Sequence, residues 1–444
     1  MKVAIIGAGI AGLSLAWFLQ QNSSTLDISI FDEKERVGGQ LYTLEKNGQR
    51  YECGPRSLRT KGAGKIILDL IEELGITEEV IEAREESRTR YLVHKGALEP
   101  VPSSLYALCS SSLGRMCLKA CIKELFIPRG RQDDESVASF FERRFGRSMV
   151  SRCIDPLTYG IYGADPHSLS MQSCFGSIYE KEKKFGSVVL GALLSPRQKQ
   201  SKKQSNVMIS FKKGVGFLPQ VLASKLCATF HLGTKIDAIV EEASHVLLSS
   251  GGKQCAFDAL FVAISPQALS TLLPLDQLKA IPQTSLVTVS TGWHDVHALP
   301  DAFGFLCPSS EDDKLLGVVF DSRVFPQHNQ LFKTRISLMF GGERAPAISC
   351  FRDEDLLSLS EDAAIKYLGI KAPFDDAVVF RARDAVARYP VGHAANVDYI
   401  EKRLGARITL LGAGFYGVSV GDAIASAKRV ATDFLRLQKS DMLI

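Results

Sequence analysis

The chain has 444 residues, of which 45% are hydrophobic and 23% are charged, and its formal net charge is +4. This is the composition of a globular protein long enough for one to three domains. The small net charge excludes the strongly basic surface that nucleic-acid binding requires, so we expect no nucleic-acid partner.

Cysteine and histidine residues are scattered along the chain without a recognisable ligand pattern. No two of the ten cysteines have C-x-x-C spacing, which argues against a zinc site and against a disulfide framework. His294 and His297 are the closest histidine pair, but no cysteine or acidic residue at a suitable spacing completes a metal set. We therefore expect no metal and a reducing, cytoplasmic compartment.

The first apolar segment, Val3 to Leu26, carries no charged residue, so a signal peptide or a membrane span must be considered. Three glycines interrupt it, and the strand-like segment Ile28–Asp32 follows directly. A cleaved or membrane-inserted segment would not need that continuation, and no other stretch supplies about twenty apolar residues. The sequence predicts a soluble or peripheral protein.

The opening of the chain alternates strand, glycine turn and helix. Val3–Ile6 is a short buried-strand run, and Ile10–Gln20 has the apolar spacing of a helix packed on a sheet. Gln40–Cys53 alternates about Asn47-Gly48, which predicts a β-hairpin. Lys65–Leu74 is an amphipathic helix that ends at the glycine following it.

The character of the sequence changes between about Arg90 and Pro196, where helical patches such as Leu118–Phe126 and Val137–Phe145 dominate. An apolar run, Val188–Leu194, is flanked by basic residues: Lys181, Lys183, Lys184, Arg197, Lys199, Lys202 and Lys203. We interpret the run as a core helix beside a solvated loop. Contact of this segment with a membrane surface is left open as the alternative.

Strand signals return after Val207. Phe257–Ile264 reads as a buried strand closed by Ser265-Pro266, and Val287–Gly342 contains further strands, including Leu315–Phe320 and Arg335–Phe340. The end of the chain repeats the opening order. A strand, a glycine turn and a helix are expected at 408–411, 412–417 and 422–435.

The first glycine turn, residues 7–12, reads G-x-G-x-x-G between a strand and a helix. Its first glycine allows a tight turn, the second lets the backbone approach a diphosphate, and the third packs the helix on the strand. The amide groups at the start of that helix would face the phosphates. Asp32 lies twenty residues beyond Gly12, where a carboxylate can bind ribose hydroxyls and would repel the 2′-phosphate of NADP.

Two further glycine-rich motifs resemble those of the FAD-containing amine-oxidase superfamily: Arg36-Val37-Gly38-Gly39, which follows Asp32, and the closing segment from Leu411 to Asp422. The resemblance implies FAD in a Rossmann-type domain. Asp32 stands where the superfamily usually has a glutamate, and Gln40 where a larger or basic residue is common. The residues implied at the cofactor are Gly7, Gly9, Ile10, Ala11, Gly12, Asp32, Glu33, Arg36, Gly38, Gly39, Gln40, Gly54, Pro55, Arg56, Ser57, Ile236, Gly414, Gly417, Val418, Ser419 and Asp422.

A closer resemblance covers most of the chain. Tyr51–Arg59, which contains Gly-Pro-Arg-Ser, and the segments at 169–175, 190–194, 308–312, 316–322 and 325–326 are similar to protoporphyrinogen oxidases. The resemblance implies that the enzyme oxidises a porphyrinogen at a terminal step of haem synthesis, with FAD as hydride acceptor and dioxygen reoxidising it to give peroxide.

Five substrate residues are implied by the same resemblance. Arg90 would pair with a propionate, the carbonyl of Gly160 would lie near the reacting edge, and the apolar walls would be Phe303, Leu306 and Met339. A large apolar disc with carboxylates needs such a slot and at least one arginine. No catalytic acid or base is assigned, because hydride loss to a flavin is the cofactor's own chemistry.

Each of these assignments has an alternative. Arg90 could form a surface ion pair with the acidic residues nearby, Glu82, Glu85 and Glu86, and the three apolar residues could be ordinary core. For the whole protein, the same chemistry on coproporphyrinogen III is the nearest rival. An amine oxidase or carotenoid desaturase would share only the FAD motifs, and a non-catalytic tetrapyrrole carrier would keep FAD as a structural element.

We therefore expect an α/β protein with a discontinuous FAD-binding domain, a mixed-sheet substrate domain and a mainly helical insertion. The FAD domain would comprise residues 1–89, 204–265 and 388–444. The helical insertion, which would form the substrate channel, would span 90–203, and the substrate sheet 266–387. A homodimer and a peripheral contact with the inner face of the cytoplasmic membrane are left open.

Overall fold

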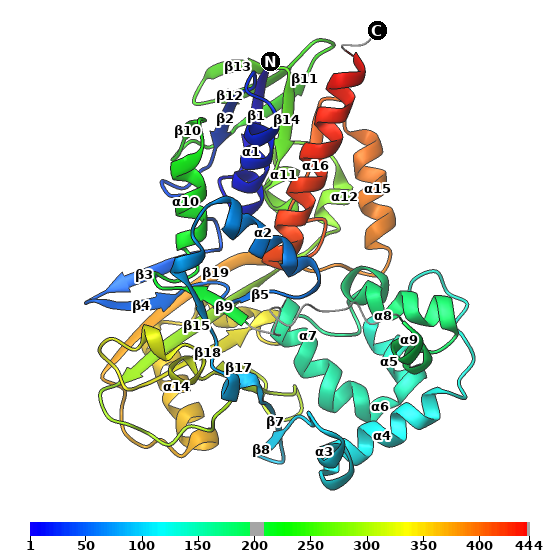
Figure 1. Cartoon of the computed structure of the whole chain (residues 1–444), viewed down its shortest axis with the longest axis vertical. Coiled ribbons are helices and arrows are strands. Elements are labelled where there is room, and N and C mark those ends of the chain that lie inside the picture. Colours follow the sequence, from blue (N-terminus) through cyan, green and yellow to red (C-terminus); the bar gives the residue numbers. More distant parts are fainter. Residues whose placement is uncertain (196–207, 442–444) are drawn as a thin grey trace.

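The computed structural model describes residues 1–195 and 208–441. Its three parts meet at a common junction (Figure 1). The parallel-sheet domain holds the first strand and the last helix of the chain, the seven-stranded domain lies below it on one side, and the helical lobe, residues 105–194, lies below it on the other. The expected fold class, α/β with a parallel sheet, a mixed sheet and a helical part, is confirmed.

The parallel-sheet domain is built on five parallel strands in the order β10-β2-β1-β14-β20. Along β1, Val3 and Ile5 pack on one side of the sheet and Ala4 and Ile6 on the other, because successive side chains of a strand face opposite sides. The strands span Thr229–His231, Asp27–Phe31, Lys2–Ile6, Ala259–Val262 and Ile408–Leu410.

Helices and a small sheet cover the two faces of this sheet. One face carries α1 (Ile10–Asn22), α2 (Lys65–Glu73), α10 (Phe217–Lys225) and α16 (Val420–Asp441). The other carries β11 (Ala238–Glu241), β12 (Val246–Ser250), β13 (Lys253–Phe257), α11 (Pro266–Ser270), α12 (Asp276–Lys279) and α15 (His393–Arg403).

The uncharged opening segment is explained by this packing. In α1 every residue from Ile10 to Leu19 is buried, and a helix that is apolar on all sides belongs inside a core. In the described ranges, no helix is both long and apolar enough to cross a bilayer.

The seven-stranded domain contains a mixed sheet in the order β19-β15-β18-β17-β16-β7-β8. Only β16 and β7 pair in parallel, and α14 (Asp353–Leu368) covers one face. The strands span Asp376–Ala387, Gln283–Trp293, Thr334–Gly341, Leu315–Val319, Gly304–Leu306, Arg90–His94 and Ala97–Pro100.

The sequence prediction of a mainly helical segment from residue 90 onward is wrong for residues 90–100, which form β7 and β8. Their turn, Lys95-Gly96, has two positive φ angles, 53° and 75°. The Glu311 carboxylate accepts both backbone N–H groups of this turn, at 2.6 and 3.1 Å. A contact from a distant segment therefore stabilises a turn that lacks the usual Asn-Gly or Asp-Gly signal.

The helical lobe has its own apolar core. Its elements are α3 (Leu105–Ser110), α4 (Ser112–Glu124), α5 (Val137–Phe145), α6 (Arg147–Met149), the π-helix η4 (Val150–Ile154), α7 (Asp155–Tyr162), α8 (Met171–Phe185) and α9 (Val188–Leu194). The interpretation of α9 as a core helix is wrong: Leu193 and Leu194 are 73% and 63% exposed. The basic residues at 197–203 lie outside the described residues.

Short elements connect the three parts. The predicted hairpin forms as β3 (Thr43–Lys46) and β4 (Gln49–Glu52) around Asn47-Gly48. Near the junction, β5 (Leu58–Arg59), β9 (Met208–Phe211) and β6 (Val80–Glu82) form a three-stranded sheet. The remaining elements are α13 (Asp321–Val324) and the 3₁₀ turns η1 (Gly62–Gly64), η2 (Thr77–Glu79), η3 (Glu85–Arg88), η5 (Pro326–His328), η6 (Gly342–Arg344) and η7 (Pro346–Cys350).

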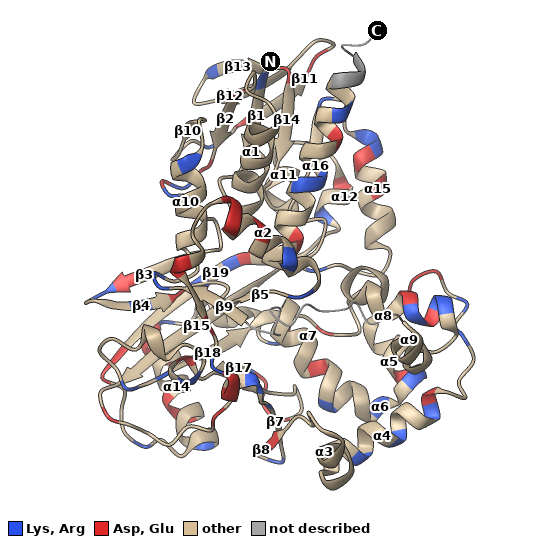
Figure 2. Ribbon diagram, in the orientation of Figure 1, with Lys and Arg blue, Asp and Glu red and all other residues tan. Residues whose placement is uncertain are grey.

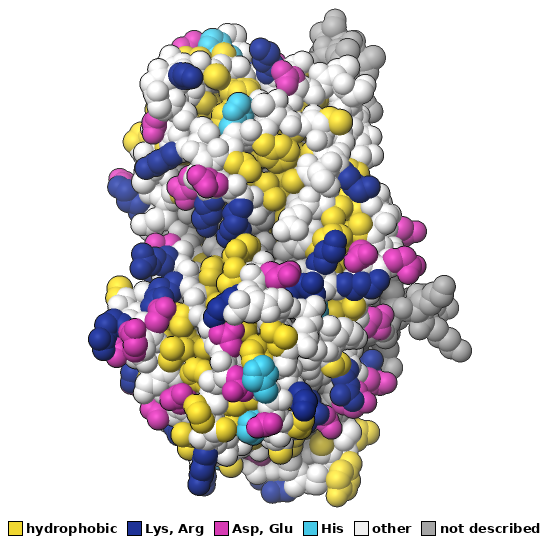
Figure 3. Space-filling model, turned by 90° about the vertical axis from the view of Figure 1, so that its left-hand side faces the viewer, with side chains coloured by type: hydrophobic (Ala, Val, Ile, Leu, Met, Phe, Trp, Pro, Cys, Tyr) yellow, Lys and Arg dark blue, Asp and Glu magenta, His cyan; other side chains and the backbone are white. Residues whose placement is uncertain are grey.

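Basic and acidic side chains are interspersed over the face of the molecule shown in Figure 3. Neither sign of charge gathers there into one large patch, as expected for a net charge of +4.

Candidate cofactor and substrate site

The opening glycine turn is shaped by two close backbone contacts. Gly7 has a φ of 110°, and a Cβ on it would lie 2.8 Å from the Ala263 carbonyl oxygen. A Cβ on Gly12 would lie 2.0 Å from the Gly7 oxygen. Gly9 differs, because a Cβ there would meet only the Gly39 Cα, at 3.9 Å. The space beside Gly9 is therefore open, so a ligand could approach the protein backbone in the middle of the turn.

The amino end of α1 presents buried backbone donors. Gly9 is its N-cap residue and supplies no side-chain cap, and no acidic residue lies in the first turn. Ile10 and Ala11 are 8% and 7% exposed, and both lie in the first turn of α1, where an N–H group has no partner within the helix. Amides at a helix amino end attract an anion, which the helix dipole also favours.

The second glycine motif lies against the first. Gly9 and Gly38 form an isolated parallel bridge, and the Gly38 N–H donates to the Ala8 carbonyl over 2.8 Å. The Arg36 guanidinium donates to the Gly39 carbonyl at 3.1 Å and lies over the Tyr42 ring. Its positive charge has no carboxylate partner in the part of the chain that the structure describes.

Asp32 is bound to the turn by its own carboxylate. Its Oδ2 accepts the Ala8 N–H at 2.8 Å, and its Oδ1 accepts the Lys34 N–H at 2.9 Å. Each oxygen keeps a second lone pair, which a ribose hydroxyl can use. The neighbouring Glu33 and Gln40 side chains are exposed.

The closing motif returns to the same place. Gly412 has a φ of 90°, and a Cβ on it would lie 3.0 Å from the Ala11 Cβ. Further along, Ser419 and Asp422 hydrogen-bond to one another, because the Asp422 carboxylate accepts the Ser419 hydroxyl at 2.6 Å and the Ser419 hydroxyl accepts the Asp422 N–H. This is a capping arrangement at the start of α16. Gly414, Gly417 and Val418 lie in the loop between.

These residues fit FAD. Open glycine backbone and the amides at the amino end of α1 suit its diphosphate, and Asp32 suits its ribose. Ile236, which follows β10, is buried in the same cluster as Phe31 at the end of β2. The two glycine motifs and the closing loop, 400 residues apart in the chain, meet around one position.

The Gly-Pro-Arg loop joins the cofactor side to the seven-stranded sheet. A Cβ on Gly54 would lie 1.9 Å from the Gln40 carbonyl oxygen, so this loop abuts the second glycine motif, and Pro55 and Ser57 flank its arginine. Arg56 pairs with Asp321 at 3.3 Å and donates to the Ser290 hydroxyl at 3.4 Å. Asp321 also accepts the Ser337 hydroxyl. Arg56 thus spans the junction.

Glu52, just before this loop, is a buried carboxyl group. It accepts the Thr43 hydroxyl at 2.8 Å and the Val215 N–H at 2.9 Å. Burial raises the pKa of Glu52 to about 7, although both hydrogen bonds and the Arg56 charge act in the opposite direction. The group therefore titrates near neutrality beneath the candidate site.

The substrate residues predicted from the sequence form two groups, and the members of each group lie next to one another. The Arg90 guanidinium is 5.3 Å from the centre of the Phe303 ring, and Phe303 and Met339 pack on the same cluster. A Cβ on Gly160 would lie 2.7 Å from the Leu306 side chain. Phe303, Leu306 and Met339 are only partly buried, so they keep apolar surface that a ligand could cover.

Arg90 does not form the surface ion pair with nearby acidic residues that was the alternative to its role in substrate binding. Glu85 pairs with Arg88 at 2.9 Å and Glu86 with Arg84 at 3.3 Å, and Arg90 itself has no ion pair with any described carboxylate. Its Nη2 atom instead lies 3.5 Å from the Met208 sulfur.

Three features of the site were not predicted from the sequence. Tyr389 contacts the closing glycine loop, the Asp321–Ser337 pair holds Arg56, and Arg59 lies beside Arg90. Arg59 could have been identified from the Gly-Pro-Arg motif, whose arginine stands three residues before it. Tyr389 had none, because no motif surrounds it.

Known proteins resemble the whole chain. A model of the family described as flavin-containing amine oxidoreductase matches residues 10–435. The chain is 30% identical to protoporphyrinogen oxidase of Bos taurus over 98% of each chain. It is 26% identical to coproporphyrinogen III oxidase of Staphylococcus aureus over 98% of this chain and 99% of the relative. A crystal structure of a candidate protoporphyrinogen oxidase from Exiguobacterium has a TM-score of 0.84 at 22% identity, with 98% of each chain covered, and so shares the fold.

Proposed function

The chain belongs to the flavin-containing amine oxidoreductase family, with FAD as its cofactor, and we propose that it oxidises protoporphyrinogen IX to protoporphyrin IX. The relatives named protoporphyrinogen oxidase, which match over nearly the full length, support the substrate. The reaction would be a terminal step of haem synthesis, with dioxygen as the electron acceptor and hydrogen peroxide as its product.

One observation carries the proposal within the structure: Arg90 lies over the Phe303 ring, and Phe303 packs in the same cluster as Met339. Arg56, which follows the second glycine motif in the chain, bonds to Ser290 of the same seven-stranded sheet. A porphyrinogen is a broad apolar ring with carboxylates at its edge. An exposed arginine next to partly buried apolar side chains complements both properties.

The protein's own part in the reaction is to bind, orient and enclose. Bound FAD would supply hydride acceptance from the macrocycle. The Ile10 and Ala11 amides would hold its diphosphate, and Asp32 a ribose. Arg90 would fix a propionate, Leu306 and Met339 would exclude water from the ring faces, and the carbonyl of Gly160 would lie at the ring edge.

Coproporphyrinogen III is the second candidate substrate. A relative with that activity in its name matches as much of the chain, and a second arginine, Arg59, lies beside Arg90. More basic residues near the slot would suit a substrate with more carboxylates. The apolar Phe303, Leu306 and Met339 favour the less carboxylated protoporphyrinogen.

The test is anaerobic mixing of the flavin-loaded protein with each porphyrinogen in turn. Bleaching of the oxidised flavin absorbance, followed by its return and by oxygen consumption when air is admitted, is the expected result. The porphyrinogen with the larger kcat/KM is the substrate. Binding of porphyrin without bleaching would replace the oxidase proposal with the carrier.

We also propose a peripheral membrane contact through the helical lobe. Exposed apolar side chains occur on α3, α4 and α9 and just after the end of α4, namely Leu105, Tyr106, Ile122, Phe126, Leu193 and Leu194. Neither α3 nor α9 carries a charged residue (Figure 2), whereas α4 and α8 supply lysines. Apolar tips bordered by basic residues suit an anionic lipid surface.

Buried residues of the helical lobe bind the amino end of α9. Glu124 and Arg144 form an ion pair that is fully buried. The same carboxylate accepts the Ser187 hydroxyl at 2.5 Å and the Val188 N–H at 2.8 Å, at the amino end of α9. The buried ion pair therefore anchors the amino end of the helix that carries the exposed Leu193 and Leu194.

Flotation with anionic phospholipid vesicles tests this contact. The protein should float with the vesicles, and the F126E/L193E variant should stay in solution. V296E, which changes an exposed valine of the seven-stranded domain, is the control and should float. A protein that does not float, but forms a dimer that F126E/L193E dissociates, would show that these helices serve a homodimer instead.

A further inference from the structure

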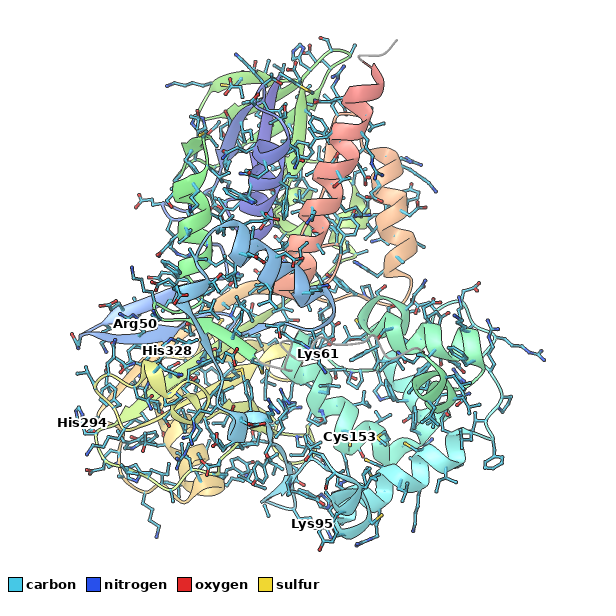
Figure 4. The ribbon with its side chains drawn as sticks, in the orientation of Figure 1. Arg50, Lys61, Lys95, Cys153, His294 and His328 are labelled. Atoms are coloured by element: carbon cyan, nitrogen blue, oxygen red, sulfur yellow. The ribbon has the colours of Figure 1, made fainter. Side chains whose placement is uncertain are left out.

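Two arginines flank one methionine at the junction of the three parts. Arg59, the last residue of β5, is the register partner of Met208 on β9. Arg90, the first residue of β7, points its Nη2 atom at the Met208 sulfur, 3.5 Å away. Both arginines are exposed. Lys61, two residues beyond Arg59, lies at the same junction (Figure 4).

The two positive charges repel one another without compensation. Partial burial and the Arg59 charge both lower the pKa of Arg90, and no carboxylate offsets them. Neither arginine forms an ion pair within residues 1–195 and 208–441. Of the acidic residues close in sequence to Arg90, Glu85 and Glu86 pair with other arginines, and Glu82 on β6 is exposed opposite Ile209.

Like charges at such a position raise the free energy of the protein unless an anion binds between them. Guanidinium groups are suited to carboxylates, because their N–H donors match both oxygens. The Arg90 guanidinium also lies over the Phe303 ring. The anion should therefore belong to a ligand whose apolar body covers Phe303.

We propose that Arg59 is a second carboxylate-binding residue, which together with Arg90 holds two neighbouring carboxylates of the tetrapyrrole. The inference rests on the proposed function and adds a residue that determines how the ring is oriented. Protoporphyrinogen IX carries its two propionates on adjacent pyrroles, so one edge of the ring would face the two arginines. The opposite, vinyl-bearing edge would then lie toward the apolar side of the slot.

A binding experiment isolates this role. Protoporphyrin IX and its dimethyl ester would be titrated into the oxidised, flavin-loaded protein and into R59M, R59K and R90M variants, with porphyrin absorbance as the signal. We expect R59M to weaken binding of the diacid about tenfold or more, as for loss of a charge-assisted hydrogen bond, and to leave binding of the ester unchanged. R59K should restore part of the affinity.

The control is R88M, which removes a neighbouring arginine that is already paired with Glu85, and it should bind both porphyrins as the unmodified protein does. Equal loss for the diacid and the ester in R59M, or no loss for either, would overturn the assignment of Arg59. In turnover, R59M should raise KM and leave kcat unchanged. If the unmodified protein oxidises no porphyrinogen, the proposed function fails, whereas the titration still decides whether Arg59 binds carboxylates.

Discussion

Tyr389 and Gly417 are joined by a hydrogen bond of 2.8 Å, in which the glycine N–H donates to the tyrosine hydroxyl oxygen. The same hydroxyl donates to the Ala413 carbonyl over 2.6 Å. Tyr389 is 1% exposed, and its ring stacks on His393 with 4.1 Å between ring centres. A buried residue outside the glycine motifs therefore fixes both ends of the closing loop.

The Y389F variant should bind FAD more weakly. It loses two hydrogen bonds and leaves a buried N–H unpaired, which costs roughly 2–3 kcal/mol in total. FAD dissociation constants from flavin fluorescence measure the effect. Y399F is the matched control, because Tyr399 is 39% exposed on the surface of α15. Equal FAD affinity of Y389F and the unmodified protein would remove Tyr389 from the cofactor site.

The opening turn gives a second prediction. In G12A the new Cβ would lie 2.0 Å from the Gly7 oxygen, so α1 must move away from the turn. We expect a loss of about 1–3 kcal/mol in the free energy of unfolding and a protein purified without flavin. G176A is the control: Gly176 lies within α8, and no atom lies within 4 Å of an added Cβ. G176A should keep its flavin and its stability.

The glycine turns and their strands could be predicted because short-range geometry largely determines them. Gly7 and Gly412 have positive φ angles of 110° and 90°, and a Cβ on Gly12 would meet the oxygen of Gly7 in the same turn. By contrast, the Lys95-Gly96 turn depends on Glu311, more than two hundred residues away. The exposure of Leu193 on α9 depends on which helices surround it, and periodicity does not contain that information.

The candidate site, too, could be predicted only in part from the sequence. The resemblance to protoporphyrinogen oxidases placed Arg90, Phe303 and Met339 on the list of substrate residues, and the structure brings them together. The partnership of Arg59 with Arg90 could not be read from the sequence. It arises because β5 and β7 approach Met208 from different directions, which only the folded chain shows.

Glu52 predicts a pH dependence of stability. Its pKa rises from 4.5 to about 7 on folding, chiefly through burial, so the folded protein holds this proton more tightly than the unfolded chain. The resulting stabilisation is fully present below about pH 4.5 and is lost as the pH rises to about 7. Over that interval the free energy of unfolding should fall by about 3 kcal/mol relative to an E52Q variant.

Urea unfolding of the unmodified protein and E52Q from pH 4.5 to 8 measures this difference. The two stability curves should diverge up to about pH 7 and run parallel above it. E45Q, on the neighbouring strand, changes a carboxylate that is 63% exposed and should follow the unmodified protein. Parallel curves for E52Q and the unmodified protein across the whole range would contradict a raised pKa of Glu52.

A thiol in the helical lobe should be reactive at neutral pH. A hydrogen bond with Cys153 lowers the pKa of Cys117 to about 7, and the nearby Arg152 charge acts in the same direction. Cys153 belongs to the π-helix of the lobe (Figure 4), and the same hydrogen bond raises its pKa. Because the thiolate is the nucleophile, the alkylation rate of Cys117 should rise with a midpoint near pH 7.

The check is iodoacetamide labelling at a series of pH values, with each cysteine quantified by peptide mass spectrometry. In C153A the hydrogen bond is absent, so the Cys117 midpoint should move up toward the ordinary thiol value of about 8.5. C121A, which changes the cysteine one helical turn further along α4, should leave the midpoint in place. A midpoint that does not respond to C153A would show that the Arg152 charge, rather than the thiol pair, activates Cys117.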